Sequence, residues 1–342
     1  MCGLRESERK KMQLKTLLSK TSYRAIIYQT LLILSLTLIF CFLIFNTLDN
    51  MRQRGIQGGF GFILDPAGFD ISESWIEFNS DESYAKAFLV GLINTLRVSA
   101  ASIVTCTFLG LLLGLGRVQS NPLIRFCCHS YTEIFRNIPL LIQLLIWYVL
   151  LVEWLPDSQA PLELSLANSN FFLSRDGLAF PWFEIGQSGS FFSTPLFDGT
   201  SIQGGAVLTP EFLALYVGLS LYTSAFVGEL IRAGYQSIDK GQIEAGLSIG
   251  LKPSQITRLI VMPQALKVII PPLTNQYLNL IKNSSLAVAI GYPDLVNISN
   301  TSLNQTGHAI ECVLIIMVVY LALSLLISLI MNSYNARVLK RG

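Results

Sequence analysis

Long apolar runs, each able to cross a bilayer, constrain this chain more than any other feature. The first covers residues 26–46 without a single charge, and about 20 such residues form a membrane-spanning helix. Further runs predict spans at residues 87–116, 138–155, 212–231, 266–290 and 310–331. With 51% hydrophobic and 13% charged residues, the chain is predicted to be an all-α membrane protein with about six transmembrane helices, because lipid-exposed backbone must satisfy its own hydrogen bonds.

The positions of the basic residues set the predicted orientation. Of the 24 Lys and Arg residues, 18 lie on segments that these spans place on one side of the membrane, which the positive-inside rule makes the cytoplasm. Both termini are therefore expected in the cytoplasm. The first span has no small-residue cleavage site after it, so we interpret it as a retained anchor and not as a signal peptide.

The spans divide the chain into segments of different character. The predicted segments are a basic tail (1–25), an extra first span (26–46), an external loop (47–85), a first core part (86–155), an external insert (156–208), a second core part (209–335) and a cytoplasmic tail (336–342). The insert is too long for a passive turn. Its aromatic residues argue against disorder, so we expect a small cap or a docking surface for an extracytoplasmic partner; they are Phe171, Phe172, Phe180, Trp182, Phe191 and Phe192.

Residues 239–264 form a mostly polar loop between the fourth and fifth spans. Asp239 can cap a short helix whose Ile243, Leu247 and Leu251 recur on one face. Small residues follow Glu244, and they would let another backbone approach closely. Gly250 and the Lys252-Pro253 pair are expected to end the helix. The pattern predicts a docking helix, and an ordinary amphipathic interfacial linker stays open as the alternative.

The spacing of this loop resembles the EAA loop of ABC importer membrane subunits. Its matching residues are Glu244, Ala245, Gly246, Gly250, Ile260 and Pro263. Gly246 stands where the family usually has a second Ala, and Met262 where it usually has Leu. The resemblance implies a type I importer permease fold with a cytoplasmic coupling helix, in which Glu244, Ala245, Gly246, Gly250 and Pro263 contact a separate ATPase subunit. ATP would be bound by that partner, with no cofactor in this chain, which contains no G-x-x-x-x-G-K-[ST] motif.

Two spans carry polar residues at depths where they are costly. Asn94 and Arg97 lie in the second span, and Arg97 is expected to face protein or water unless it extends to the outer interface. In the fifth span Asn275, Asn279 and Lys282 follow i, i+4, i+7 and share one face. Residues 271 and 272 are both Pro and are expected to break or kink this span early. A polar face on a kinked span predicts a water-facing wall.

Three further runs resemble the permeases of polar-amino-acid uptake. These are Asn94-Thr95 with Ser99, the run from Phe135 to Leu140, and Lys282-Asn283-Ser284-Ser285-Leu286. In that family the last run lines the translocation pathway, so the resemblance places substrate at Asn94, Arg97, Asn275, Asn279, Lys282, Asn283, Ser284 and Ser285. Asn283 replaces the usual Asp, which weakens the case for a strictly cationic substrate. The alternative is that Lys282 extends to the interface and Asn283 caps a helix.

The extra first span and the long insert resemble the general L-amino acid permease branch. The resemblance implies a bacterial inner membrane location, an L-amino acid substrate, an extracytoplasmic amino-acid-binding protein, and a second permease subunit that is a related chain or a second copy. No further partner is expected besides these and membrane lipids, and the chain is not expected to bind nucleic acid.

Other chemistry is not indicated. The six Cys and two His show no metal-ligand spacing, and no catalytic constellation is found. Glu229 and Arg232, at i, i+3 near the end of the fourth span, are interpreted as a structural ion pair. Two alternatives remain at this point: an ion-coupled secondary amino acid transporter, which would predict inverted repeats, and a non-transporting scaffold.

Overall fold

The computed structural model describes residues 20–53, 58–166, 169–182 and 193–340. Most of the predicted basic tail, and Phe191 and Phe192 of the insert, lie outside these residues. The chain divides into two compact units, with the boundary in the sequence between Gly59 and Phe60. The first contains helix α2 (Lys20–Gln53), whose apolar side chains from Ile26 to Phe45 are exposed all around. Such a surface is suited to lipid.

The described part of the chain holds five helical stretches long and apolar enough to span a membrane, or six if one bent helix pair counts as one span. They are Arg24–Thr47, Tyr84–Arg117, Pro210–Gln236, Pro253–Ile290 and Ala309–Arg337, with the bent pair Pro122–Asn137 and Leu140–Trp154. This agrees with the predicted all-α membrane class. The first, second, fourth and sixth predicted spans are each extended by one to six residues at both ends, whereas the fifth begins 13 residues earlier and ends at the predicted residue.

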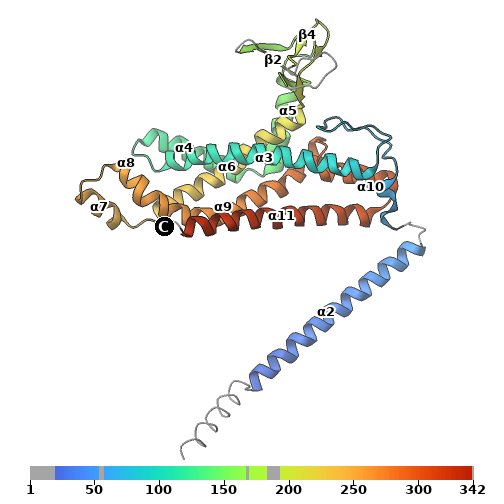
Figure 1. Ribbon diagram of the computed structural model, residues 1–342, viewed down its shortest axis with the longest axis horizontal. Coiled ribbons are helices and arrows are strands. Elements are labelled where there is room, and N and C mark those ends of the chain that lie inside the picture. The colour runs from blue at the N-terminus through green and yellow to red at the C-terminus, as the bar shows by residue number, and fades with distance from the viewer. Residues whose placement is uncertain (1–19, 54–57, 167–168, 183–192, 341–342) are drawn as a thin grey trace, which may run out of the picture. The chain divides into compact units, whose positions relative to one another are not determined.

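Helices α3 (Tyr84–Arg117) and α6 (Pro210–Gln236) form the centre of the second unit. The hydroxyls of Ser83 and Thr209 cap them, accepting from backbone N–H groups of their first turns. Glycines bring them together: a Cβ on Gly114 would meet the Gly228 carbonyl oxygen at 2.7 Å. Only a residue without a side chain allows this approach, as at other helix contacts in membranes. The two helices run side by side in Figure 1.

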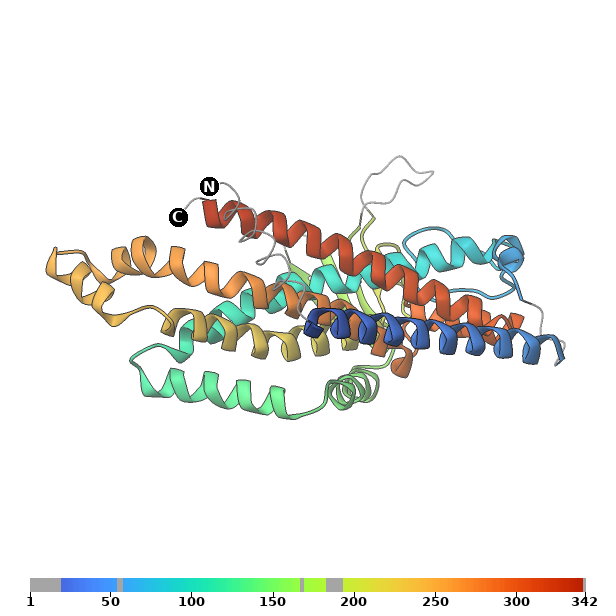
Figure 2. The ribbon, with the colours of Figure 1, turned by 90° about the horizontal axis from the view of Figure 1, so that it is seen from below.

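The predicted link and third span fold differently from expectation. Helix α4 (Pro122–Asn137) occupies most of the predicted cytoplasmic link and packs on α3 and α6, and α5 (Leu140–Trp154) then turns away by 103°. Figure 2 shows α5 nearly end-on where it leaves α4. The turn falls at Pro139, which disfavours a helical conformation at Ile138 and supplies no N–H. The predicted link is thus mostly helical, and α4 and α5 form a bent helix pair in place of one straight span.

Of the predicted break or kink at the paired prolines, the break is absent. Helix α9 (Met262–Asn283) runs without interruption through Pro271 and Pro272. Its irregular segments lie at its two ends instead, a π-helical turn η2 (Thr257–Val261) before it and a 3-10 helix η3 (Ser284–Ile290) after it. Membrane helices tolerate proline where neighbouring structure compensates the freed carbonyls.

The loop before α9 contains helices α7 (Lys240–Ser248) and α8 (Pro253–Ile256), as predicted. They lie at one end of the second unit in Figure 1, and α10 (Leu295–Thr306) lies at the other. Helix α11 (Ala309–Lys340) packs along α9 and against α10. The end that holds α7 and α8 is the predicted cytoplasmic one, which makes the end that holds α10 the predicted external one. There a short 3-10 helix η1 (Phe60–Leu64) also contacts α3.

The external insert adds β structure to an otherwise helical core. Strands β1 (Leu162–Leu166), β2 (Ser169–Ser174), β3 (Gly177–Phe180) and β6 (Ala206–Leu208) form an antiparallel sheet in that order. Strands β4 (Leu196–Phe197) and β5 (Ile202–Gln203) form a separate two-stranded antiparallel hairpin. Leucine alternates with polar residues along β1, a pattern typical of a strand. The sheet follows α5 in Figure 1.

Candidate translocation pathway and docking loop

The docking loop has the caps that its sequence predicts. The Asp239 carboxylate accepts from the Gly241 N–H at 2.9 Å and starts α7, and Gly250 ends it with φ of +82°. Only glycine enters this left-handed region without strain. Gly246 is buried, and a Cβ there would lie 3.1 Å from side-chain carbons of both Ile256 and Ile260. The spacing from Gly246 to Ile260 is thus a packing contact between α7 and the segment leading into α9.

The outer side of α7 has no partner among the described residues of this chain. Glu244 and Ala245 are exposed, as is Pro263 at the start of α9. Leu247 is 51% and Ile249 77% exposed. Apolar side chains held outside the spans in this way favour a protein surface that covers them.

The predicted polar face of α9 exists. Asn275, Asn279 and Lys282 all lie exposed on it, whereas Leu280 and Ile281 are buried. An exposed polar stripe on a membrane helix must meet water or another protein, because contact with lipid is costly.

The two serines that follow this polar face make hydrogen bonds to nearby backbone carbonyl groups. The hydroxyls of Ser284 and Ser285 donate to the carbonyl oxygens of Ile281 and Lys282, each at 2.7 Å. Ser284 is buried, and Asn283 and Ser285 are half-buried. Asn283 precedes η3 without a side-chain capping hydrogen bond. The alternative in which Asn283 caps a helix therefore fails.

Two tyrosines that the sequence analysis missed connect the core helices. The hydroxyl of Tyr277 on α9 lies 2.7 Å from that of Thr107, and the hydroxyl of Tyr216 on α6 lies 2.6 Å from that of Thr105. Both threonines are on α3. Tyr277 falls between Asn275 and Asn279 in the sequence. A polar hydroxyl between two other polar residues is the sequence signal that could have identified it.

Asn94 and Thr95 fasten α3 to the start of α10. The Asn94 amide donates to the carbonyl oxygens of Glu73 at 2.8 Å and Pro293 at 3.0 Å. The Thr95 hydroxyl accepts from the Leu295 N–H at 3.2 Å. Both side chains are fully buried. In this structure they join the external loop, α3 and α10, and they make these contacts away from the polar face of α9.

Arg97 faces protein. Its guanidinium donates to the Glu73 carboxylate, which also accepts from the Thr209 hydroxyl. The guanidinium carbon lies 5.0 Å from the centre of the Trp75 ring and 4.5 Å from that of Phe212, both within cation–π range. The Arg97 side chain is only 11% exposed. The first of the two expected environments, protein instead of the outer interface, is the observed one.

Glu73, absent from the predicted site, carries the other half of this pair. Burial raises the pKa of its carboxyl, and the Thr209 hydrogen bond and the Arg97 charge lower it by less. The cost of removing this carboxylate from water thus exceeds the stabilisation that Thr209 and Arg97 provide, as is common for buried ion pairs. A lone acidic residue in a loop gives no sequence signal of such a contact.

A cavity of about 730 Å³ opens beside Arg97 between α3, α6 and the insert. Trp75, Leu178, Phe180 and Phe212 are among the apolar side chains that line it. Side chains of the insert thus share this cavity with side chains of two core helices.

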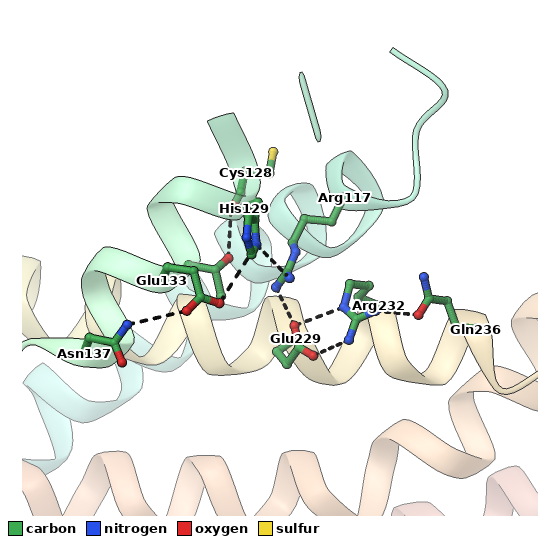
Figure 3. Close-up of polar contacts among 9 residues, drawn as sticks. Arg117, Cys128, His129, Glu133, Asn137, Glu229, Arg232 and Gln236 are labelled. Atoms are coloured by element: carbon green, nitrogen blue, oxygen red, sulfur yellow. Dashed lines mark hydrogen bonds and ion pairs between the residues drawn. The ribbon is translucent and has the colours of Figure 1, made fainter. Parts of the chain in front are cut away.

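The predicted pair of Glu229 and Arg232 is present and has a third member. The Glu229 carboxylate accepts from the guanidinium groups of both Arg232 and Arg117, which joins α6 to the end of α3 (Figure 3). Arg117 also contacts His129 Nδ1 at 3.2 Å on α4. The Arg136 guanidinium carbon lies 5.2 Å from the Phe226 ring centre, an anchor for the end of α4. Within the described ranges no three His, Cys, Asp or Glu side chains form a metal-ligand group.

Comparison with known proteins gives consistent matches. Residues 107–340 match the family model described as binding-protein-dependent transport system inner membrane component. The chain is 39% identical to the general L-amino acid transport system permease protein AapQ of Rhizobium johnstonii, over 92% of each chain. It is 40% identical to the putative amino-acid ABC transporter permease protein YhdX of Escherichia coli, over 92% of this chain and 94% of that protein.

A solved structure supports the fold. The crystal structure of an amino acid ABC transporter with histidines aligns with a TM-score of 0.55 and 27% identity, over 74% of this chain and 95% of that one. None of these matches supports the ion-coupled secondary transporter.

Proposed function

The chain belongs to the family of binding-protein-dependent transport system inner membrane components, and from this premise we propose that it is a permease subunit of an ATP-driven importer for L-amino acids of polar or broad type. The observation that carries the proposal is the docking loop: α7 is fixed on the residues leading into α9 by Gly246, while Leu247 and Ile249 remain exposed. Relatives named as L-amino acid and amino-acid permeases support the substrate class.

We place three partners around this chain. A separate ATPase covers the exposed side of α7, with Glu244, Ala245, Gly246, Gly250 and Pro263 at or beneath the contact. An extracytoplasmic binding protein delivers the amino acid at the end that holds the insert. A second permease subunit faces α9, because one helix face cannot enclose a pathway.

The pathway follows the polar face of α9. Asn275, Asn279 and Lys282 present amide and ammonium groups that can replace the water around a polar amino acid. Asn283, Ser284 and Ser285 shape its far end, where η3 begins. Asn94 and Arg97 act at the external end, where they hold the loop and α10 against α3. ATP binding in the partner would bias two arrangements of these helices by acting on α7.

Co-purification tests the proposal. The chain is isolated in mild detergent from its native cells, and every associated protein is identified. We expect an ATPase with the wild type and its loss with Glu244→Lys, because a reversed charge on the exposed side of α7 opposes docking. Arg337→Glu is the matched control: it reverses an exposed charge at the same predicted side, away from the loop, and should keep the ATPase.

Uptake measurements then address the substrate. The ATPase complex, reconstituted with its binding protein, is expected to import polar L-amino acids only with ATP. The absence of any nucleotide-binding protein after crosslinking would contradict the importer, and an ATPase that remains with Glu244→Lys would contradict the role of the loop.

A further inference from the structure

A second pocket, of about 410 Å³, lies at the predicted cytoplasmic end between α3, α4 and α6. Arg117, Arg125, Arg232 and His129 line it together with Pro122, Phe126 and Gln236. Its lining thus holds three guanidinium groups and no carboxylate. Figure 3 shows Arg117, His129 and Arg232 reaching from three helices toward one region.

Nearby acidic groups leave part of this charge uncompensated. Glu229 serves Arg117 and Arg232 at once. Glu133 lies 3.9 Å from His129 and accepts from Asn137. Arg125 is exposed, and its guanidinium donates to the Ser120 carbonyl oxygen at 3.3 Å. Because this carbonyl oxygen carries no net charge, it does not neutralise the positive charge of Arg125.

The arrangement suits a phosphate group. Guanidinium groups offer planar pairs of N–H donors that match phosphate oxygens. Glu229 holds Arg117 and Arg232 in position, so less side-chain entropy is lost when an anion binds. The first N–H groups of α4 are not the donors, because the Asn121 side chain already accepts from Leu123 and Ile124.

The rim of the pocket indicates the source of the phosphate. Helix α4 presents Arg125 and His129 toward the pocket, whereas Leu123 and Ile134 do not line it and are 68% and 55% exposed. A short helix with apolar side chains outward and basic ones inward is typical of the membrane interface. There the apolar residues contact acyl chains and the basic residues contact headgroups.

We propose that Arg117, Arg125 and Arg232 bind a phosphate group in this pocket, supplied by the headgroup of an anionic phospholipid. The site is separate from the polar face of α9 and from the exposed side of α7. It requires only that the chain sits in a membrane, so it does not rest on the proposed transport function.

Native mass spectrometry of the purified full chain tests the site. The protein, with any subunits that co-purify, is exchanged into phosphatidylcholine and titrated with phosphatidylglycerol. Arg125→Gln removes the exposed guanidinium, which makes no ion pair with a described side chain, and its folding is checked by size-exclusion profile. Arg337→Gln, which removes an exposed cation on α11, controls for general attraction to anionic lipid.

We expect the wild type and Arg337→Gln to retain phosphatidylglycerol in preference to phosphatidylcholine, and Arg125→Gln to bind it about fivefold more weakly, since one basic residue near a membrane surface contributes on the order of that factor. Equal retention by wild type and Arg125→Gln, or equal retention of the two lipids by the wild type, would overturn the site. Inorganic phosphate titrated in a parallel arm separates the sources: if it binds and displaces phosphatidylglycerol, with the same loss in Arg125→Gln, the phosphate site stands and the lipid assignment is overturned.

Discussion

At the scale of single residues, burial of the Asp294 side chain controls the ionisation of its carboxyl group. Asp294 is completely buried, and its carboxylate accepts from the Asn297 N–H at 2.8 Å, which caps α10. Burial raises its pKa to about 7, although backbone hydrogen bonds lower it in part. The ionised form is therefore costly in the folded chain.

This pKa predicts a pH-dependent stability. An acid whose folded-state pKa lies above its unfolded value, about 4 for Asp, contributes stability that is full below the unfolded pKa and is lost as pH rises through about 7. Asp294→Asn keeps a capping oxygen and removes the charge. We expect its thermal unfolding midpoint in detergent to exceed that of the wild type at about pH 8, with a gap that narrows toward about pH 4.

The matched control for this measurement is Asp157→Asn, which removes an exposed carboxylate that also accepts a backbone N–H. A midpoint difference for Asp294→Asn that stays constant between these two pH values would contradict the burial argument.

At the scale of elements, α7 shows how a missing side chain sets a position. Gly246 stands where the resembling family usually has Ala, and the atoms that a Cβ would meet are the flexible ends of Ile256 and Ile260. Such ends can move by a few tenths of an ångström. A methyl group should therefore fit, whereas a larger side chain must push α7 away.

We accordingly expect Gly246→Ala to keep the ATPase on co-purification and Gly246→Leu to lose it, with over-packing costs of about 1–3 kcal/mol. Gly241 gives the comparison, since a Cβ there meets only the Asp239 side chain, at 3.5 Å or more. Gly241→Ala should behave as the wild type. An ATPase retained by Gly246→Leu would show that this contact does not position the docking surface.

At the scale of elements, features with a local sequence signal could be predicted, and features that depend on distant contacts could not. Apolar length and basic flanks predict the long spans, and Asp239 and Gly250 predict both ends of α7, because each signal is local. The course of α9 through Pro271 and Pro272 depends on packing against α6 and α11, which no local pattern contains. The same holds for Arg97: its cost in a membrane was evident, but its partner Glu73 lies 24 residues away.

At the scale of the whole molecule, the polar face of α9 makes this chain incomplete by itself. Asn275, Asn279 and Lys282 lie on the surface of the second unit, at membrane depth. A second permease subunit across this face would enclose water between the two chains. The face would then be wet although lipid surrounds the assembly.

Labelling tests this arrangement. In a chain whose native cysteines are replaced, Asn279→Cys in the assembled complex is expected to react with a membrane-impermeant maleimide at least tenfold faster than Leu325→Cys. Leu325, on α11, is an exposed apolar residue suited to lipid, where thiolates form poorly. Equal rates at both positions would argue against a water-filled pathway along α9.

The shortness of α5 has a consequence for the surrounding lipid. Its 15 residues extend about 22 Å at 1.5 Å per residue, against a hydrocarbon layer about 30 Å thick. The length of α5 alone therefore falls short of this layer, and α5 passes as a span only together with α4, from which it turns by 103°. The angle at that turn thereby becomes a variable that sets where in the bilayer α5 begins before the chain enters the insert.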